Sequence, residues 1–448
     1  MIPHVLKARS VHLLGLLITL VVNLPAQTAD VEREGSALTQ TVVCPGFWTQ
    51  VSSSGPSPRA GHDLAWVPRS EAHPELKSAV PHTRAAHGEV VLFGGSGENS
   101  SRLGDTWTWN GTVWTQVADT GPSPRNGSAV AYDHRHRQLV LFGGTGVPGN
   151  QFQENQDTWA WNGTKWTELA AGGGPSGRNG HGMAYDRKRK KVVLFGGGIT
   201  FVRPLLNDTW EWDGTAWSQR FPASAPDVRD VFGMIYDNAH ARTVLFGGSQ
   251  DTVDFGDTWT WDGTVWTQVA DTGPGPRAAL GMTYDSARHR TVLFGGVNQA
   301  TGIFSGDTWE WDGVRWTQVA STGPAPRSSG MAYDKDGGKA VIFGGFRADG
   351  VLLQDTWEWT GPIYGCRGRA PGDLNCDGRV NRQDLTVLVS ALGHAACGAG
   401  DPRDLNHDGK IDAQDARLLT YKCTVWGCKC GRDREDEGDA DDFDCDDE

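Results

Sequence analysis

The chain has 448 residues, enough for two or three domains, and it is rich in tryptophan (20) and glycine (60). The glycines follow no collagen-like period, so they indicate many tight turns and short strands. The formal net charge is −13, but residues 432–448 carry −9 of it. Because the rest is close to neutral and holds no basic stripe, nucleic acid is excluded as a partner. Residues 425–448 are expected to be a disordered acidic tail.

The N-terminal segment has the pattern of a secretory signal. Lys7 and Arg9 precede an apolar run over residues 13–22, which Pro25 and Ala26 follow. The run has only about ten residues, which is too short to span a bilayer. The sequence therefore predicts a signal peptide over residues 1–29, a secreted chain and no membrane span.

The eight cysteines agree with export. They are even in number, and none lies between Cys44 and Cys366. In an oxidising compartment such cysteines are expected to form disulfides rather than a zinc cluster.

A unit of roughly 50 residues recurs six times between residues 46 and 360. Each copy has an apolar run ending in Gly-Gly, then Asp-Thr-Trp-x-Trp, a tight turn with a further Trp, and an arginine that mostly stands in Gly-Pro-x-Pro-Arg. Each copy is expected to form four strands, named A to D in chain order, with the Gly-Gly run as strand B. The Asn-Gly or Asp-Gly between strands C and D predicts a type I′ hairpin.

The ends of the repeat indicate how a ring would close. The sixth copy stops after Trp359 without a strand D, while an orphan Phe-Trp-Thr-Gln-Val stands at residues 47–51. Pairing this orphan with the last strand C completes the sixth unit and removes exposed sheet edges. Cys44 precedes the orphan and Cys366 follows its expected partner, so we predict a Cys44–Cys366 disulfide that staples the ring.

These motifs in this order resemble the kelch repeat of the galactose oxidase central-domain type, over about 315 residues. The resemblance implies an all-β fold, a six-bladed kelch-type β-propeller over residues 44–366 closed by an N-terminal strand. The copper site of galactose oxidase requires a cysteine cross-linked to a tyrosine within the propeller. Residues 45–365 contain no cysteine, so copper is not expected.

Two segments near the C-terminus match the twelve-residue calcium loop at its oxygen-bearing positions, and each runs into an apolar-periodic helix. The sequence therefore predicts two calcium ions. The first set of ligands is Asp373, Asn375, Asp377, Arg379, Asn381 and Asp384, and the second is Asp404, Asn406, Asp408, Lys410, Asp412 and Asp415, with Arg379 and Lys410 contributing backbone carbonyls.

Duplicated loop-and-helix units that end in Asp resemble a type I dockerin domain, here over residues 367–424 as a small α-helical calcium-binding domain. The resemblance implies calcium-dependent folding and docking onto a cohesin domain through the loop–helix junctions. Carried onto this chain, the recognition positions are Arg382, Gln383, Ala413 and Gln414. They differ between the two halves, which argues against a symmetric dual mode of binding. A disulfide between Cys376 and Cys397 is a further hypothesis for this domain.

Two residue types in the propeller are candidates for a binding site. Six arginines open the strands A and are expected to ring one mouth of the channel: Arg59, Arg125, Arg178, Arg229, Arg277 and Arg327. They either bind acidic ligands or pair with the Asp of Asp-Thr-Trp, and their repetition in every unit favours pairing. His62 and His181 share one position of strand A. Because only two of the six units have histidine there, the position is not expected to be a designed site.

Binding specificity is expected in the B–C loops, which vary from unit to unit. The leading hypothesis is a secreted, monomeric, non-catalytic interaction protein that recognises a carbohydrate or protein ligand through these loops and docks through its dockerin-like module. The alternative is a carbohydrate-active enzyme, a polysaccharide hydrolase or lyase. This hypothesis rests only on the common occurrence of dockerin-like modules in such enzymes. A third hypothesis is a structural surface protein.

Overall fold

The computed structural model describes residues 42–68, 88–147, 150–199, 204–364, 372–375, 379–397 and 401–425. All of them lie in the second of two compact units, which spans residues 40–448. The predicted signal peptide, Asp377, Cys366, Cys376 and residues 426–448 of the predicted tail lie outside the described residues.

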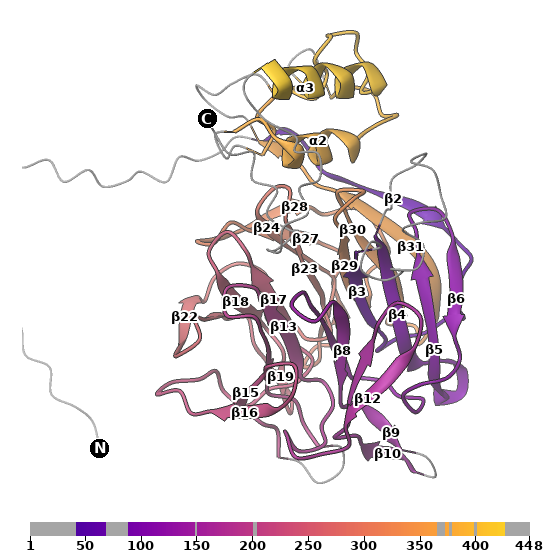
Figure 1. Ribbon diagram of the computed structural model, residues 1–448, viewed down its shortest axis with the longest axis vertical. Helices are drawn as coiled ribbons and strands as arrows, with labels where there is room; N and C mark the ends of the chain where they lie inside the picture. The colour runs from indigo at the N-terminus through magenta and orange to yellow at the C-terminus, as the bar shows by residue number, and fades with distance from the viewer. Residues whose placement is uncertain are drawn as a thin grey trace, which may run out of the picture. The chain divides into compact units, whose positions relative to one another are not determined.

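The described strands form six four-stranded antiparallel sheets, one for each sequence repeat (Figure 1). Blade one contains β3 (Asp63–Val67), β4 (Glu89–Ser96), β5 (Arg102–Trp109) and β6 (Trp114–Ala118). Blade two contains β7 (Ala129–Asp133), β8 (Gln138–Phe142), β11 (Thr158–Trp161) and β12 (Trp166–Ala170), and blade three contains β13 (Gly182–Asp186), β14 (Lys191–Phe195), β15 (Thr209–Trp212) and β16 (Trp217–Arg220).

Blades four to six repeat the pattern. Blade four contains β17 (Gly233–Asp237), β18 (Arg242–Phe246), β21 (Thr258–Trp261) and β22 (Trp266–Ala270), and blade five contains β23 (Gly281–Asp285), β24 (Arg290–Phe294), β27 (Thr308–Trp311) and β28 (Trp316–Ala320). Blade six contains β29 (Ser328–Asp334), β30 (Lys339–Phe346), β31 (Leu352–Thr360) and β2 (Phe47–Ser52).

The ring closes as the sequence predicts. β2 pairs with β31 antiparallel, with Trp48 opposite Trp359, so the first strand of the propeller completes the last blade (Figure 1, indigo β2 beside orange β31). The six strands A, namely β3, β7, β13, β17, β23 and β29, contact one another in this order, and β29 contacts β3. They are therefore the innermost strands and surround the central channel.

A tryptophan–threonine bond joins each blade to the preceding one. The first Trp of each strand D donates its indole N–H to the Thr of Asp-Thr-Trp in the blade before. Trp114 of blade one reaches Thr356 of blade six (2.8 Å), and Trp48 of blade six reaches Thr308 of blade five (2.9 Å). The repeated Thr and Trp are thus ring-building residues, which explains why every copy keeps them.

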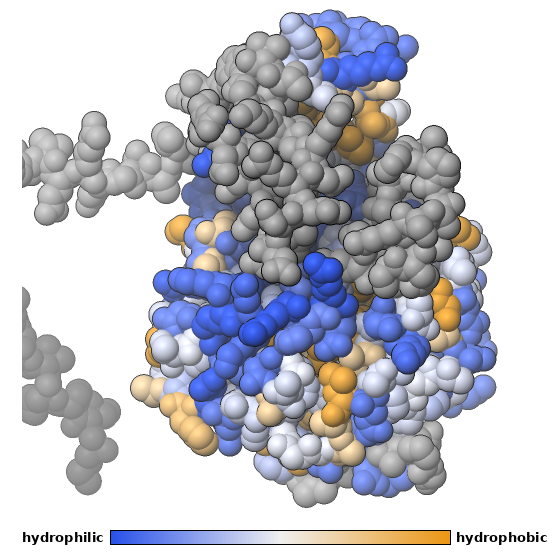
Figure 2. Space-filling model, viewed as in Figure 1, coloured by the Kyte–Doolittle hydropathy of each residue, from blue (hydrophilic) through white to orange (hydrophobic). Residues whose placement is uncertain are grey.

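The core lies between the blades. Strand B is apolar on both faces, because neighbouring sheets cover both; in β14, Val192, Val193, Leu194 and Phe195 are all fully buried. In the view of Figure 2 the hydrophobic residues left on the surface are scattered over a mostly hydrophilic face. Three small hairpins extend the B–C loops: β9 (Thr145–Val147) with β10 (Asn150–Glu154), β19 (Ser249–Gln250) with β20 (Val253–Asp254), and β25 (Val297–Asn298) with β26 (Ile303–Phe304).

The C-terminal region holds helices α2 (Arg382–Val389) and α3 (Ala413–Val425). The buried residues Leu388 of α2 and Leu419 of α3, with Ala391 and Ile411 between the helices, join a hydrophobic cluster that also contains residues of blades five and six. A short pair, β1 (Val42–Cys44) with β32 (Ile363–Tyr364), lies in the same cluster. None of the described helices is long and apolar enough to cross a membrane.

The predicted Cys44–Cys366 disulfide is wrong in this structure, because Cys44 is bonded to Cys397, with the two Cα atoms 5.7 Å apart. Cys44 packs in the cluster that the dockerin-like helices enter, so a cysteine of that domain reaches it. The same bond replaces the suggested pairing of Cys397 with Cys376. The bond ties the strand next to the ring closure to the helical domain, rather than to the end of strand C.

Candidate functional site

The six repeated arginines are buried in ion pairs within their own blades. Arg178 is fully buried and donates from both terminal nitrogens to the two carboxylate oxygens of Asp208, at 2.6 and 2.9 Å. It also donates to the carbonyl of Gly196 and to that of Ser176. The same two-nitrogen pairing recurs in the other blades: Arg59–Asp105, Arg125–Asp157, Arg229–Asp257, Arg277–Asp307 and Arg327–Asp355.

These contacts confirm the Arg–Asp pairing that the repetition favoured, and they leave the alternative, arginines that bind acidic ligands at the channel mouth, without support. Burial alone would raise the pKa of Asp208, but the hydrogen bonds and charge of Arg178 outweigh it and lower that pKa below its ordinary value. The Asp also accepts the indole N–H of Trp210 at 2.7 Å. The repeated Arg, Asp and Trp therefore form one structural unit that joins strands A, B and C.

A chain of backbone hydrogen bonds links neighbouring blades around the channel at the B–C end. Two residues after the Arg, each of five blades places a residue with positive φ. In blades two to five the N–H of this residue donates to the carbonyl of its counterpart in the preceding blade at 2.7–3.0 Å. We name these residues the collar: Gly61, Gly127, Gly180, Val231 and Ala279. Blade six has one residue fewer between Arg327 and its strand-A Met331 than blade three has between Arg178 and Met183.

His62 and His181 lie next to the collar, between blades rather than in a ligand pocket. Each is at least nine-tenths buried, and each packs its ring edge-to-face against a strand-B phenylalanine of the preceding blade, Phe343 and Phe142 respectively. Burial, assisted by the nearby charge of Arg59 or Arg178, lowers the pKa of both imidazoles to about 3. The two histidines are therefore neutral packing residues at physiological pH.

One carboxyl group breaks the repeat below the collar. Asp63 occupies the position that is Gly182, Gly233 or Gly281 in other blades, and it accepts a hydrogen bond from Ser128 of blade two. Burial raises the pKa of Asp63 to about 7.

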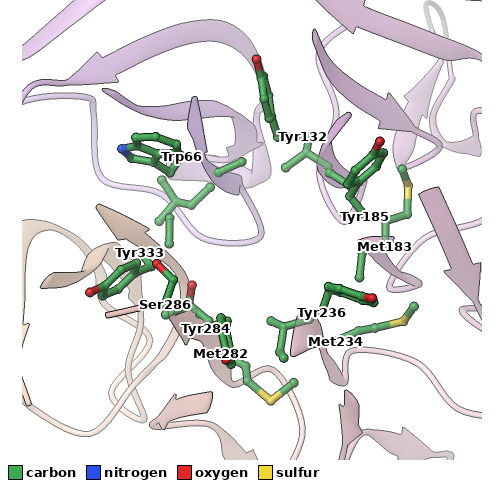
Figure 3. Close-up of a pocket in the computed structure, with 18 of the residues that line it drawn as sticks. Trp66, Tyr132, Met183, Tyr185, Met234, Tyr236, Met282, Tyr284, Ser286 and Tyr333 are labelled. Atoms are coloured by element: carbon green, nitrogen blue, oxygen red, sulfur yellow. The ribbon is translucent and has the colours of Figure 1, made fainter. Parts of the chain in front are cut away.

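The opposite end of the channel holds a cavity of about 220 Å³, at the A–B turns (Figure 3). Three consecutive strand-A positions line it in all six blades. The first is Leu64, Val130 or a methionine, the second is Ala, Ile or Thr, and the third is an aromatic residue: Trp66, Tyr132, Tyr185, Tyr236, Tyr284 and Tyr333. The cavity wall is therefore largely apolar and aromatic.

The tyrosines are held from outside the cavity. The hydroxyls of Tyr185, Tyr236 and Tyr284 accept the backbone N–H of Arg135, Lys188 and Ala239, each in the A–B turn of the preceding blade. Figure 3 accordingly shows the hydroxyls of Tyr185 and Tyr236 directed away from the cavity centre. Burial raises the pKa of Tyr236 to about 12, so the hydroxyl stays protonated.

In blades two to six the rim of the cavity is formed by the second residue after the aromatic position. This residue differs among the five blades: His134, Arg187, Asn238, Ser286 and Lys335. The ring of His134 packs against the rings of Tyr132 and Tyr185. The sequence prediction placed binding specificity in the B–C loops instead, at the other end of the channel. The signal was present, since this is a turn position at which the repeat changes from blade to blade.

Among the described residues of the B–C loops, two aromatic side chains of neighbouring blades are in contact. Phe304 of β26 and Phe346 of β30 lie with ring centroids 6.1 Å apart, and Phe346 is exposed. Phe255, by contrast, packs on the guanidinium of Arg229 at 4.0 Å and is part of the scaffold. The variable loops thus present apolar side chains on blades five and six.

The two calcium-loop segments repeat the same local geometry. In the first, both carboxylate oxygens of the buried Asp384 accept backbone N–H groups of the loop, from Leu374, Asn375 and Asn381. In the second, the buried Asp415 accepts from Leu405, Asn406 and Asp412 in the same way. Each last Asp therefore holds the start and the end of its loop together.

The described donors fit calcium. Asp404, Asn406, Asp408, Asp412 and Asp415 bring hard oxygen atoms to one tight loop, in which Gly409 has a φ of +84° and Asp404 accepts the N–H of Asp408 and of Gly409. Asp373 and Asp384 of the first loop are both buried. Buried carboxylates so close in sequence are the arrangement that a divalent cation stabilises.

The four predicted recognition positions lie at the starts of the two helices, as the repeat requires. Arg382, Ala413 and Gln414 are exposed, while Gln383 is half-buried and its side chain bonds that of Asn375. The face of α3 also exposes Leu418 and Tyr421, the latter to 67%. Comparable exposed apolar residues do not occur in the described part of α2.

Comparison with known proteins agrees with the propeller and with the dockerin-like domain. Residues 371–422 match the family model of the dockerin type I domain. An F-box/kelch-repeat protein of Arabidopsis thaliana is 29% identical over 221 residues, which is 44% of this chain and 40% of that protein. The chain thus spans about two fifths of the length of this curated relative.

The six closed sheets define the class of protein, a six-bladed β-propeller, whose repeats are similar to those of the kelch-repeat relative. More particularly, this chain is such a propeller with a type I dockerin-like domain at residues 371–422.

Proposed function

We propose that this chain is a secreted interaction protein, which docks through its dockerin-like domain onto a cohesin-bearing partner and presents its propeller to a carbohydrate or protein ligand. The observation that carries the proposal is the match of residues 371–422 to the dockerin type I domain, on two loops with the same buried last aspartate. Dockerins act in protein docking, and a kelch propeller supplies a rigid scaffold with variable loops.

Calcium supports this docking by ordering the loops. The second loop would hold the ion with Asp404, Asn406, Asp408, Asp412 and Asp415, and with the carbonyl of Lys410. The first would hold it with Asp373, Asn375, Asp377, Asn381 and Asp384, and with the carbonyl of Arg379. When bound, the cation supplies positive charge that offsets the repulsion among these carboxylates. The helix starts that carry Arg382, Gln383, Ala413 and Gln414 are then fixed for contact.

The experiment is a titration of the full chain with a panel of cohesin domains by isothermal calorimetry, in calcium and in excess EGTA. We expect saturable binding with at least one cohesin in calcium and a loss of about a hundredfold or more in EGTA. The variant Asp404→Ala with Asp415→Ala should behave in calcium as wild type does in EGTA, while Asp213→Asn in a propeller turn should bind normally. Binding that is equal with and without calcium contradicts the proposal.

The alternative of a polysaccharide hydrolase or lyase stays a hypothesis. Among the described residues that line the channel cavity there is no carboxylate, and the six repeated arginines are engaged in ion pairs. No specific observation therefore favours it over the interaction protein.

A further inference from the structure

We infer that the two halves of the dockerin-like domain have different partners: the first half, with α2, is seated on the chain's own propeller, and only the second half, with α3, offers its face to another protein. This inference rests on the proposed docking function and specifies the half that makes the contact. Its consequence is a single orientation of the bound partner.

The first argument is the set of contacts that α2 and the segment after it make with blade six. The hydroxyl of Thr360, at the end of β31, donates to the carbonyl of Ser390 at 3.3 Å. The rings of Phe47 in β2 and of His394 lie with their centroids 4.6 Å apart. Together with the disulfide to β1 and the shared hydrophobic cluster, these contacts tie the first half to the strands that close the ring.

The second argument is a glycine in the A–B turn of blade six. A Cβ on Gly338 would lie 2.7 Å from the carbonyl oxygen of Thr386 in α2 and 2.8 Å from the methyl carbon of the same residue. The backbone alone does not require glycine, because this turn position has a positive φ and a side chain in blades two to five: Arg137, Lys190, Ala241 and His289. Blade six therefore departs from the repeat where α2 approaches it, and the glycine allows the close contact.

The third argument is that duplicated residues of the two helices differ in exposure. Each residue of α2 has a counterpart 31 positions later in α3. Val387 and Ser390 are buried, whereas their counterparts Leu418 and Tyr421 are exposed to 37% and 67%. The side of α2 that packs against the propeller thus has an exposed counterpart on α3.

The exposed face of α3 suits an apolar protein surface that carries a carboxylate. Ala413, Gln414, Arg417 and Leu418 are exposed along this face, and none of the four is acidic. Arg417 supplies a cation next to the apolar Leu418, and this combination favours a partner with an acidic residue at the edge of an apolar patch. The counterpart of Arg417 in α2 is Thr386, so the first half has no cation at that position.

Calorimetry with the calcium-loaded full chain and the cohesin domain selected from the panel tests the orientation. Leu418→Glu and Arg417→Glu should each weaken binding about tenfold or more. If both halves were available, the first half would still bind, and the affinity of either variant would stay within about twofold of wild type. That result in both variants overturns the inference. Val113→Glu, which changes an exposed aliphatic residue in a propeller turn, is the matched control and should bind normally.

Hydrogen–deuterium exchange of the calcium-loaded chain without a cohesin tests the seat of α2. Gly338→Lys places in the turn of blade six the residue that blade three has there, and it should speed the exchange of α2 amides about tenfold or more while α3 amides stay unchanged. Ala241→Lys, at the same position of blade four, is the matched control and should alter neither helix. Circular dichroism and the melting temperature report folding, and Gly338→Ala is the milder replacement if Gly338→Lys does not fold.

Exchange of α2 that is equal in wild type and in a folded Gly338 variant overturns the inference, whether or not a cohesin binds. Because this measurement needs no partner, it separates the inference from the proposed docking function. If no cohesin of the panel binds while Gly338→Lys releases α2, the docking function fails and the seat of α2 on the propeller stands.

Discussion

The two ends of the propeller channel are built from different kinds of residue. At the B–C end, residues that recur in nearly every blade bond to one another: Arg with Asp, and collar residue with collar residue. At the A–B end, the rim residue differs among blades two to six and borders a cavity. Side chains that satisfy one another are unavailable to a ligand, so repetition marks the scaffold and variation marks the surface open to binding.

The largest effect should come from breaking a repeated ion pair. Asp208→Asn leaves the buried Arg178 guanidinium without its charge partner, and we expect the free energy of unfolding to fall by about 3–5 kcal/mol. The control is Asp213→Asn in the exposed C–D turn of the same blade. Two other blades already have Asn at this position, so the variant should change the free energy of unfolding by less than about 0.5 kcal/mol. Urea unfolding measures both, and equal losses would contradict the assignment.

The next effect concerns the buried histidines and depends on pH. Their folded pKa of about 3 lies below the ordinary 6.5, so the unfolded chain binds the extra protons and stability falls as the pH drops from about 6.5 towards 3. At pH 5 this costs about 2 kcal/mol for each histidine relative to pH 8. The six aspartates with lowered pKa act in a separate window, where stability is lost below their ordinary 3.8.

Replacement with phenylalanine, which blade four has at this position, should remove that loss. We expect His62→Phe and His181→Phe each to reduce the difference in stability between pH 8 and pH 5 by about 2 kcal/mol. Phe232→Leu, at the same position of blade four, should lower stability equally at both pH values. Thermal melts at the two pH values provide the measurement, and an unchanged pH difference in the histidine variants would refute the buried neutral state.

A smaller effect is expected in the collar. Val231 adopts a φ of +48°, a conformation that costs a β-branched residue about 1–2 kcal/mol, while blades one to three have glycine there. Val231→Gly should therefore raise stability by about 0.5–1 kcal/mol, after the entropic cost of glycine. The reverse change, Gly180→Val, should lower it by about 2 kcal/mol or more, because its Cβ would lie 3.1 Å from that of Asp230. Chemical denaturation distinguishes the two signs.

The smallest effect on stability is expected at the rim. Arg187→Gln and Lys335→Gln should each shift the free energy of unfolding by no more than about 0.5 kcal/mol, since both side chains are partly exposed and neither belongs to the repeated pairs. A loss of 2 kcal/mol or more in either variant would show that the rim is scaffold as well. The B–C end and the A–B end of the channel would then not differ in the way described.

Much of the propeller could be predicted because its repeat states the same information six times. The orphan Trp48 segment and the missing last strand specified the closure, and the structure confirms it in the pairing of β2 with β31. The buried run in β14 follows from the cover on both faces of this strand. The pairing of Arg178 with Asp208 was foreseen from repetition alone.

What the sequence did not reveal depends on contacts between distant segments. The position of Cys44 against the C-terminal helices rests on packing that no local motif encodes, so its bond to Cys397 was missed. The collar depends on the conformation of Gly127 and Val231 relative to their neighbours in adjacent blades. The cavity was missed for the same reason, since only the folded ring brings Arg187 and Lys335 to one rim.

Hydrogen–deuterium exchange of the native chain tests most directly whether the two ends differ as described. The collar amides of Gly127, Gly180, Val231 and Ala279 each donate to a neighbouring blade, so they should exchange only through global unfolding and be among the slowest in the propeller. Amides of the A–B turns around the rim should exchange many times faster. Collar amides that exchange as fast as those of the exposed turns would contradict a B–C end held together by hydrogen bonds between the blades.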